Sequence, residues 1–360
     1  MFSQSFDLLV EEARAWVAHW ATLEPQPVHV DPEHRWRIRS SLQKAVRRGQ
    51  TDRAIRMALA LHRLDPRYAW RSVQIIAVED VGLGSPDVVL WSTAAQRSAF
   101  RKSVGEVLLL IAVTRCMAKA VKSRAAVELS FVTETSEPEM FRLFGGMTTD
   151  QLLDRFGGSD PYEAYAAVSV LRGIVPIGYR IRPPDQRGTQ CAYEMLPDLV
   201  RTTHLRSVQA ALLHPLDNMS LGYVVVARLE PDDLERQDEM FTSWMIDGYP
   251  AEAYDQHERL GRRSIRTFAE RVRSVSAPLR RLSRAKAAAA VADAVFVIEG
   301  QCLDRWVGGI DLDRLRQQAD RFSLTRHGVS EGEEQEVREL VASRLDELHH
   351  IRTMIVTDAQ

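Results

Sequence analysis

The sequence has few of the residues that mark secreted, disulfide-bonded or metal-binding proteins. It contains only three cysteines, Cys116, Cys191 and Cys302, which lie far apart and include no CxxC pair. This odd number and wide spacing predict neither a disulfide framework nor a cysteine metal site. We therefore expect buried thiols in a reducing compartment.

The chain also lacks segments that would send it through a membrane. Its first residues, MFSQSFDLLVEE, have no basic region and become acidic where a secretory signal would be apolar. The longest aliphatic runs, such as Val107 to Val113, are too short to span a bilayer. We expect a soluble, cytoplasmic protein with no membrane partner.

An excess of one charge is missing as well. Lys+Arg 47 against Asp+Glu 49 leaves a net charge of -2, so any surface for nucleic acid must be local. No internal repeat or low-complexity linker divides the chain. With 360 residues, 45% of them hydrophobic, the sequence predicts one large domain or two ordinary ones.

Clear capping signals are present in the first quarter of the chain. Asp31 and Asp65 each precede a proline, which is typical of a helix start, and Ser85-Pro86 repeats the pattern. Gly49 and Gly82 suit left-handed helix ends. These signals predict helices over 32–48, from a Thr51 cap to Leu64, over 66–81 and from Pro86 onward. The short connections favour an antiparallel bundle.

The rest of the chain mixes helical and extended patterns. Further helices are expected over 106–120, over 123–131 with Ser123 as a cap, over 151–156 after Thr148 or Thr149, and from about 251 onward. Prolines, glycines and alternation over 174–196 predict paired strands, with LGYVVVARL at 221–229 as a third. The predicted fold class is mostly α: a helical bundle, a small β element and a second helical region. Its predicted parts are an N-terminal helix (1–30), a helical domain (31–172) and a C-terminal region (173–360).

Four strings in the first third occur in the order found in a known family. They are SLQKAVRRG at 41–49, AIRMA at 54–58, WR at 70–71 with IIAVEDVGL at 75–83, and AVKSRA at 120–125. These strings resemble the helical collar that follows the ATPase of clamp-loader-like AAA+ proteins in the replication-associated recombination protein A and Werner-helicase-interacting-protein family. The motif residues are Lys44, Arg47, Arg71, Glu79, Asp80, Lys122 and Ser123.

The resemblance implies a stand-alone collar, of the kind a mobile genetic element encodes, acting in DNA replication, recombination or repair. Its implied partners are a second copy of this chain, a clamp-loader-like AAA+ ATPase, and DNA. The GxxxxGK[ST] loop that cradles nucleotide phosphates is absent. We therefore expect no ATPase activity, no cofactor and a non-enzymatic accessory or oligomerisation role.

Glu79 and Asp80 stand at a helix C-terminus, where the macrodipole disfavours negative charge. This position predicts either a salt bridge at the helix corner to Arg47, Arg71 or Lys122, or carboxylates that face the N-terminus of the helix beginning at Pro86. Both are favoured over acid-base chemistry. Lys122-Ser123 fits either an anion contact or a simple helix start, and the latter is favoured.

Two stretches are strongly basic. Residues 259–286 contain ten Lys/Arg against Glu270 alone, and residues 35–56 contain eight against Asp52 alone. Arginines at helical spacing can follow DNA phosphates, whereas poor aromatic interleaving disfavours base stacking. The predicted DNA contacts are Arg259, Arg262, Arg263, Arg266, Arg280, Arg281 and Arg284. The alternative is a protein-only scaffold in which these arginines pair with the acidic segments 230–239 and 331–347.

The remaining catalytic-looking string is Tyr254-Asp255-Gln256-His257. An Asp-x-His pair can ligate a metal or form an acid-base couple, but neither His204, His214 nor His349 has the spacing of a third ligand. An enzyme using Asp255 and His257 is therefore the weaker alternative to a polar pair that caps a helix.

Overall fold

The computed structural model describes residues 6–21, 32–176, 186–228, 235–237, 244–303, 305–307 and 310–359. Within these ranges the chain forms twenty α-helices and two small two-stranded sheets. This confirms the mostly α fold class with a small β element. No helix in the described ranges is both long and apolar enough to cross a membrane.

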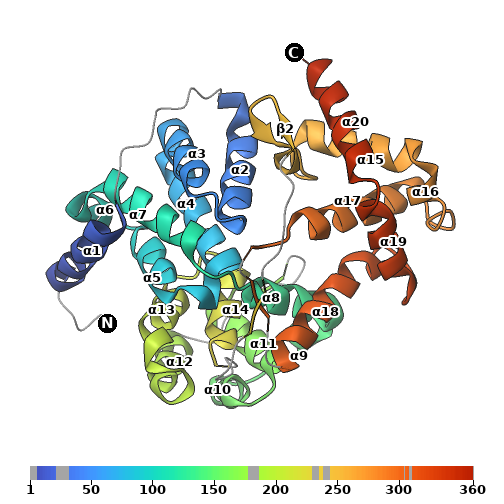
Figure 1. Ribbon diagram of the computed structural model, residues 1–360. Coiled ribbons are helices and arrows are strands. Elements are labelled where there is room, and N and C mark those ends of the chain that lie inside the picture. The colour runs from blue at the N-terminus through green and yellow to red at the C-terminus, as the bar shows by residue number, and fades with distance from the viewer. Residues whose placement is uncertain are drawn as a thin grey trace.

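The helices gather into three lobes, each around its own hydrophobic cluster (Figure 1). The first lobe buries Leu42, Trp70 and Leu110 among its helices. Its helices are α1 (Phe6–Trp20), α2 (Arg35–Arg47), α3 (Thr51–Leu64), α4 (Pro66–Ile76), α5 (Pro86–Ala94), α6 (Ser98–Val104) and α7 (Glu106–Lys119). Short 3-10 turns at Pro32–His34 and Gly82–Gly84 and a π-helical turn at Ala77–Val81 complete it.

Several predicted helix boundaries of this lobe are confirmed. The Asp65 carboxylate accepts from the Tyr68 amide at 3.0 Å, and Gly49 has a positive φ of 64°. Thr51 does not cap α3, because its hydroxyl donates to the Gly49 carbonyl instead. Ser85 does not cap α5 either; its hydroxyl lies 3.7 Å from the Cys116 sulfur. Asp31 lies outside the described residues.

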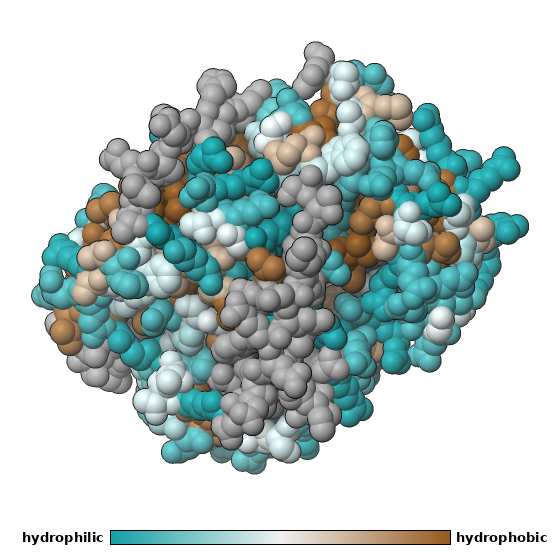
Figure 2. All heavy atoms as spheres, in the orientation of Figure 1, coloured by the Kyte–Doolittle hydropathy of each residue, from teal (hydrophilic) through white to brown (hydrophobic). Residues whose placement is uncertain are grey.

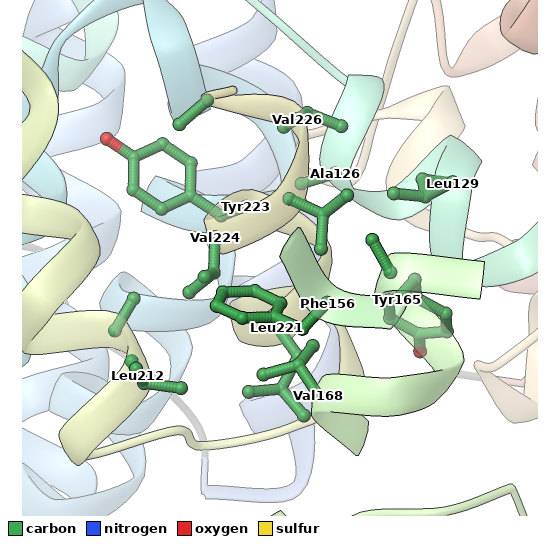
Figure 3. Close-up of a cluster of buried hydrophobic side chains, with 14 of the residues drawn as sticks. Ala126, Leu129, Phe156, Tyr165, Val168, Leu212, Leu221, Tyr223, Val224 and Val226 are labelled. Carbon is green, nitrogen blue, oxygen red and sulfur yellow. The ribbon is translucent and has the colours of Figure 1, made fainter. Parts of the chain in front are cut away.

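The second lobe packs around the apolar helix α14 (Figure 3), where Leu221, Tyr223 and Val224 meet side chains of α10 and α11. Of the two predicted caps, Thr148 and Thr149, the structure uses Thr148, which forms a reciprocal capping box with Gln151. The lobe comprises α8 (Ala125–Ser136), α9 (Pro138–Phe144), α10 (Thr149–Gly157), α11 (Pro161–Arg172), α12 (Gln186–Leu199), α13 (Thr202–Leu213), α14 (Asn218–Val226) and, packed on α8, α18 (Ile310–Thr325). Its core includes residues on both sides of position 172.

The strands predicted at 174–196 and 221–229 are wrong wherever the structure describes them. Residues 186–199 form α12, and residues 218–226 form α14. Helix α14 is apolar all round because other helices surround it, and such a run cannot be told from a buried strand by pattern alone. Residues 177–185 and 229 lie outside the described residues.

The third lobe contains the C-terminal helices and a hairpin. Its elements are α15 (Arg259–Arg271), α16 (Arg273–Ser276), α17 (Arg284–Glu299), α19 (Glu333–Ala342), α20 (Leu345–Thr357), β2 (Met245–Ile246), β3 (Tyr249–Pro250) and a 3-10 turn at Ala251–Ala253. Strand β1 (Glu235–Gln237) pairs antiparallel with β4 (Arg305–Val307). The 3-10 turn and β3 pack against α2, so the third lobe is joined to the first.

Candidate functional site

Helix α15 carries the start of the basic stretch that was predicted to contact DNA. The Glu258 carboxylate caps its first turn by accepting from the Gly261 amide at 2.7 Å. Leu260, Ile265 and Phe268 anchor the opposite side of the helix in the core. The solvent face therefore presents the polar side chains of this amphipathic helix.

Four predicted contact residues share that solvent face: Arg259, Arg262, Arg263 and Arg266 are exposed and line one shallow hollow. Within the described chain, none of the four forms an ion pair with a carboxylate. We call this set the α15 arginine face. It concentrates positive charge that no carboxylate of the described residues pairs with.

The three other predicted contacts lie at and before the start of α17. Arg280 and Arg284 are exposed, whereas Arg281 pairs with Glu333 and donates to the Ser330 hydroxyl at 2.7 Å. Arg281 therefore follows the alternative prediction, in which the arginines pair with the acidic segment 331–347. Arg271 and Arg273, in the same basic stretch, are also exposed.

The second basic stretch is largely internal, contrary to its reading as a phosphate-tracking surface. Arg37, Lys44, Arg47 and Arg48 are all buried. Arg37 lies 3.4 Å from Glu258, and Arg48 forms an ion pair with Glu252. Arg37 and Arg48 therefore hold the third lobe against the first through these two buried pairs.

The central residue of this interior is Arg47. Its Nε donates to Asp80 Oδ1 at 2.7 Å, and one Nη donates to Glu79 Oε1 at 2.9 Å. The other Nη reaches the Gly300 carbonyl at 3.2 Å, while the Arg47 carbonyl accepts from the Leu303 amide at 2.8 Å. The predicted corner salt bridge is thus confirmed for Arg47, and it also ties in the chain that follows α17.

Arg124 is a member of this network that sequence reasoning missed. Its guanidinium lies 3.5 Å from Glu79 and 3.6 Å from Asp80. Burial alone would lower the pKa of Arg124, but the two carboxylates outweigh burial and raise it. We call Arg47, Glu79, Asp80 and Arg124 the buried charge cluster. Arg124 follows Ser123 in the string AVKSRA, and this position was the sequence signal that could have identified it.

The other motif residues have different places. Arg71 is exposed and is not a partner of the carboxylates. Lys122 is buried and donates to the Ala118 carbonyl at 3.1 Å. Ser123 does not cap α8; its amide donates to the Asp80 carbonyl at 3.0 Å. Six of the seven motif residues are therefore interior, where they stabilise one chain.

Lys44 is buried, unlike a lysine on the surface of a collar domain. Its ammonium group is 5.2 Å from the centroid of the Phe296 ring, and its side chain is buried. Burial, with a contribution from the nearby Arg47 charge, lowers the pKa of Lys44 to about 8. A second buried ion pair, Arg352 with Glu299, lies at the end of α17. The charged form of Lys44 is thus destabilised, whereas the neighbouring Arg47 is paired with carboxylates.

The Asp255 and His257 pair has no catalytic arrangement. The Asp255 carboxylate accepts from the Ser40 hydroxyl at 2.7 Å, from the Trp36 indole at 3.3 Å and from the His257 backbone amide at 2.8 Å. The His257 ring is exposed beside Phe296. Among the described residues, no group of three His, Cys, Asp or Glu could hold a metal ion. Asp255 is buried and ties the third lobe to α2, but the pair does not cap a helix, because Glu258 caps α15.

A cleft of about 590 Å³ lies between the second and third lobes. It is lined mainly by α8 and α18 of the second lobe and by α17 and α19 of the third. Its arginines face nearby carboxylates, as in the Arg305–Glu128 and Arg338–Asp320 pairs. Because positive and negative groups alternate along its walls, the cleft has no clear preference for a charged ligand.

Comparison with known proteins adds no assignment, since no family model, curated protein or solved structure matches this chain.

Proposed function

We propose that the protein is a non-enzymatic accessory and oligomerisation factor in DNA replication, recombination or repair, and that it contacts the DNA backbone through the α15 arginine face. One observation carries the proposal: four exposed arginines line one hollow, with no carboxylate of the described chain paired to them. Uncompensated arginines attract phosphates, and binding is strengthened by release of the counterions condensed on DNA.

The composition of this face favours duplex over single-stranded DNA. The hollow is completed by Leu260 and Thr267, and no aromatic ring lines it. Single-strand binders usually stack bases on aromatic side chains, whereas arginines alone suit the regular phosphates of a duplex. The proposal therefore expects binding that varies little with base sequence.

The test is a titration of labelled duplex DNA across a salt series. If each arginine neutralises one phosphate, log affinity falls with log salt at a slope of roughly −0.9 per contact. Replacing Arg262, Arg263 and Arg266 together by Gln should weaken binding for every sequence and flatten the slope by about two to three units. All three side chains are exposed, so the variant should remain folded.

The matched control removes the same charge elsewhere. Arg63, Arg67 and Arg71 are also exposed, and they lie on α3 and α4. Their triple Gln variant should bind like the wild type. A wild type without salt-dependent affinity, or equal losses in both triple variants, would refute the proposal and favour the scaffold alternative, which the Arg281–Glu333 pair already illustrates.

A further inference from the structure

A second cavity, of about 760 Å³, lies in the first lobe where it meets the second. Helices α1, α4, α5, α6 and α13 supply most of its walls. This volume falls within the range of small-molecule sites in proteins, which are mostly apolar with a few polar groups. The cavity is separate from both the α15 arginine face and the buried charge cluster.

Its apolar walls are formed by aliphatic and aromatic side chains. Leu9 comes from α1, Leu90 and Ala94 from α5, Phe100 from α6, and Leu213 from α13. Such a surface gains free energy when it covers an apolar molecule, at roughly 25 cal/mol for each Å² removed from water. A hydrocarbon or aromatic body therefore suits most of this cavity.

The charged groups that line the cavity carry positive charge only. Arg97, Arg172 and His214 belong to its wall, and no Asp or Glu does among the described lining residues. One Arg97 Nη lies 3.0 Å from His214 Nε2, and one Arg172 Nη donates to the Leu213 carbonyl at 3.3 Å. The two guanidinium groups thus converge on the end of α13.

This positive potential has no described carboxylate to offset it. Burial lowers the pKa of His214, and the charges of Arg97 and Arg172 lower it further. The Arg172 side chain is half-buried, and burial lowers its pKa as well. An anion in contact with Arg97 and Arg172 would offset these positive charges.

We infer that this cavity binds a small amphiphile whose apolar body lies among Leu90, Phe100 and Leu213 and whose anionic group contacts Arg97 and Arg172. The anionic group is a carboxylate or a phosphate monoester, because both accept paired hydrogen bonds from a guanidinium. This binding activity is independent of the proposed contact with DNA.

The test is calorimetric titration of the full chain with decanoate, decyl phosphate and decanol, each kept below the concentration at which it forms micelles. One anion should bind per chain and saturate, and uncharged decanol should bind about tenfold more weakly or worse, since a hydrogen bond to a charged group is lost. The tighter of the two anions identifies the head group.

Two variants keep the inference falsifiable. Arg97→Gln, at the exposed position just before helix α6, should weaken anion binding about tenfold. Lys102→Gln, on α6 and also exposed but outside the cavity wall, should change nothing. Ala94→Phe should fill the space and weaken all ligands. Failure of both anions to saturate, equal binding of decanol, unchanged binding in Ala94→Phe, or an equal loss in Lys102→Gln would overturn the inference.

Discussion

At the scale of single residues, the interior of this protein is unusual for the number of cations it holds. Arg47 and Arg352 are wholly buried, yet each has a carboxylate in contact. Lys44 differs because its neighbours include Arg47, and burial is the largest influence on it. Arg47 and Arg352 are each paired with a carboxylate, whereas Lys44 carries a cost that depends on pH.

Replacing Lys44 by Met should therefore remove a pH dependence of stability. The pKa of Lys44 is about 8 in the folded chain and about 10.4 in an unfolded one. Between these values only the unfolded chain holds the proton, so the free energy of unfolding of the wild type rises with pH. Relative to Lys44→Met, the rise should be roughly 2 kcal/mol between about pH 7 and about pH 9.5.

Urea unfolding at several pH values measures this difference. Lys119→Met, at an exposed position on α7, is the control and should show no such trend relative to the wild type. A wild-type stability that falls over this pH range relative to Lys44→Met would contradict the assignment of a lowered pKa.

Neutralising Asp80 should be far more damaging. Asp80→Asn keeps the shape of the side chain but leaves Arg47 and Arg124 with a single buried carboxylate, Glu79. Removing one member of a buried pair typically costs about 3 kcal/mol or more. Denaturant unfolding should show this loss, while Asp154→Asn on the exposed side of α10 should stay within about 0.5 kcal/mol of the wild type.

At the scale of elements, helices α14 and α8 cross in close contact. A Cβ built on Gly222 would lie 2.3 Å from the Ala126 carbonyl oxygen, so these two backbones approach as only glycine permits. This contact holds the most apolar helix of the second lobe against the helix that follows Arg124.

The substitution Gly222→Ala has two opposite effects on the free energy of unfolding. Alanine in a helix interior is favoured over glycine by about 1 kcal/mol, whereas forcing a backbone apart in a packed core costs about 1–3 kcal/mol or more. Because the obstructing atom is backbone, we expect a net loss of about 2 kcal/mol in unfolding free energy. In Gly157→Ala the new methyl meets only the flexible end of Met195, so thermal unfolding should change little.

Sequence reasoning located elements where local chemistry decides and failed where packing decides. The Asp65 cap and a cap at Thr148 or Thr149 depend on short-range signals, and both were predicted. Helix α14 was read as a strand because a fully surrounded helix has no polar stripe. The Asp247-Gly248 turn between β2 and β3 has positive φ at both residues, and this local hairpin signal was overlooked.

The candidate site was predicted in part for the same reason. The exposed Arg259, Arg262, Arg263 and Arg266 follow from helical spacing around an apolar stripe. The burial of Arg37 and Arg48 depends on Glu258 and Glu252, which lie more than two hundred residues away in the sequence. No local sequence pattern predicts such a pairing.

At the scale of the whole molecule, one edge offers apolar surface to a partner. Phe6 and Leu8 on α1 and Val107 and Leu108 in the first turn of α7 are large and exposed, and α1 packs on α7. Figure 2 shows hydrophobic side chains at the left edge, where α1 and α6 lie in Figure 1. If the chain self-associates through residues 32–126, we therefore expect α7 to form the contact.

Replacing Val107 and Leu108 together by Ser should dissociate a self-associated form. Removing two half-exposed aliphatic side chains takes apolar area from the contact while leaving the lobe's core intact. Light scattering over a concentration series should show a lower mass for this variant than for the wild type. Leu143→Ser, at an exposed position on α9, should leave the mass unchanged; a monomeric wild type at every concentration would contradict the expectation.

The contact between Arg47 and Gly300 also sets an order of events during synthesis, because 253 residues separate the two. At about 5–20 residues per second, the ribosome needs roughly 13–50 s to reach Gly300 after Arg47 has been made. During that interval the first lobe presents Arg47 and Asp80 on a surface that is still uncovered. The charges of Arg47 and Asp80, which are paired in the folded chain, keep this uncovered surface hydrated. Hydrophobic side chains of equal volume at these two positions would not.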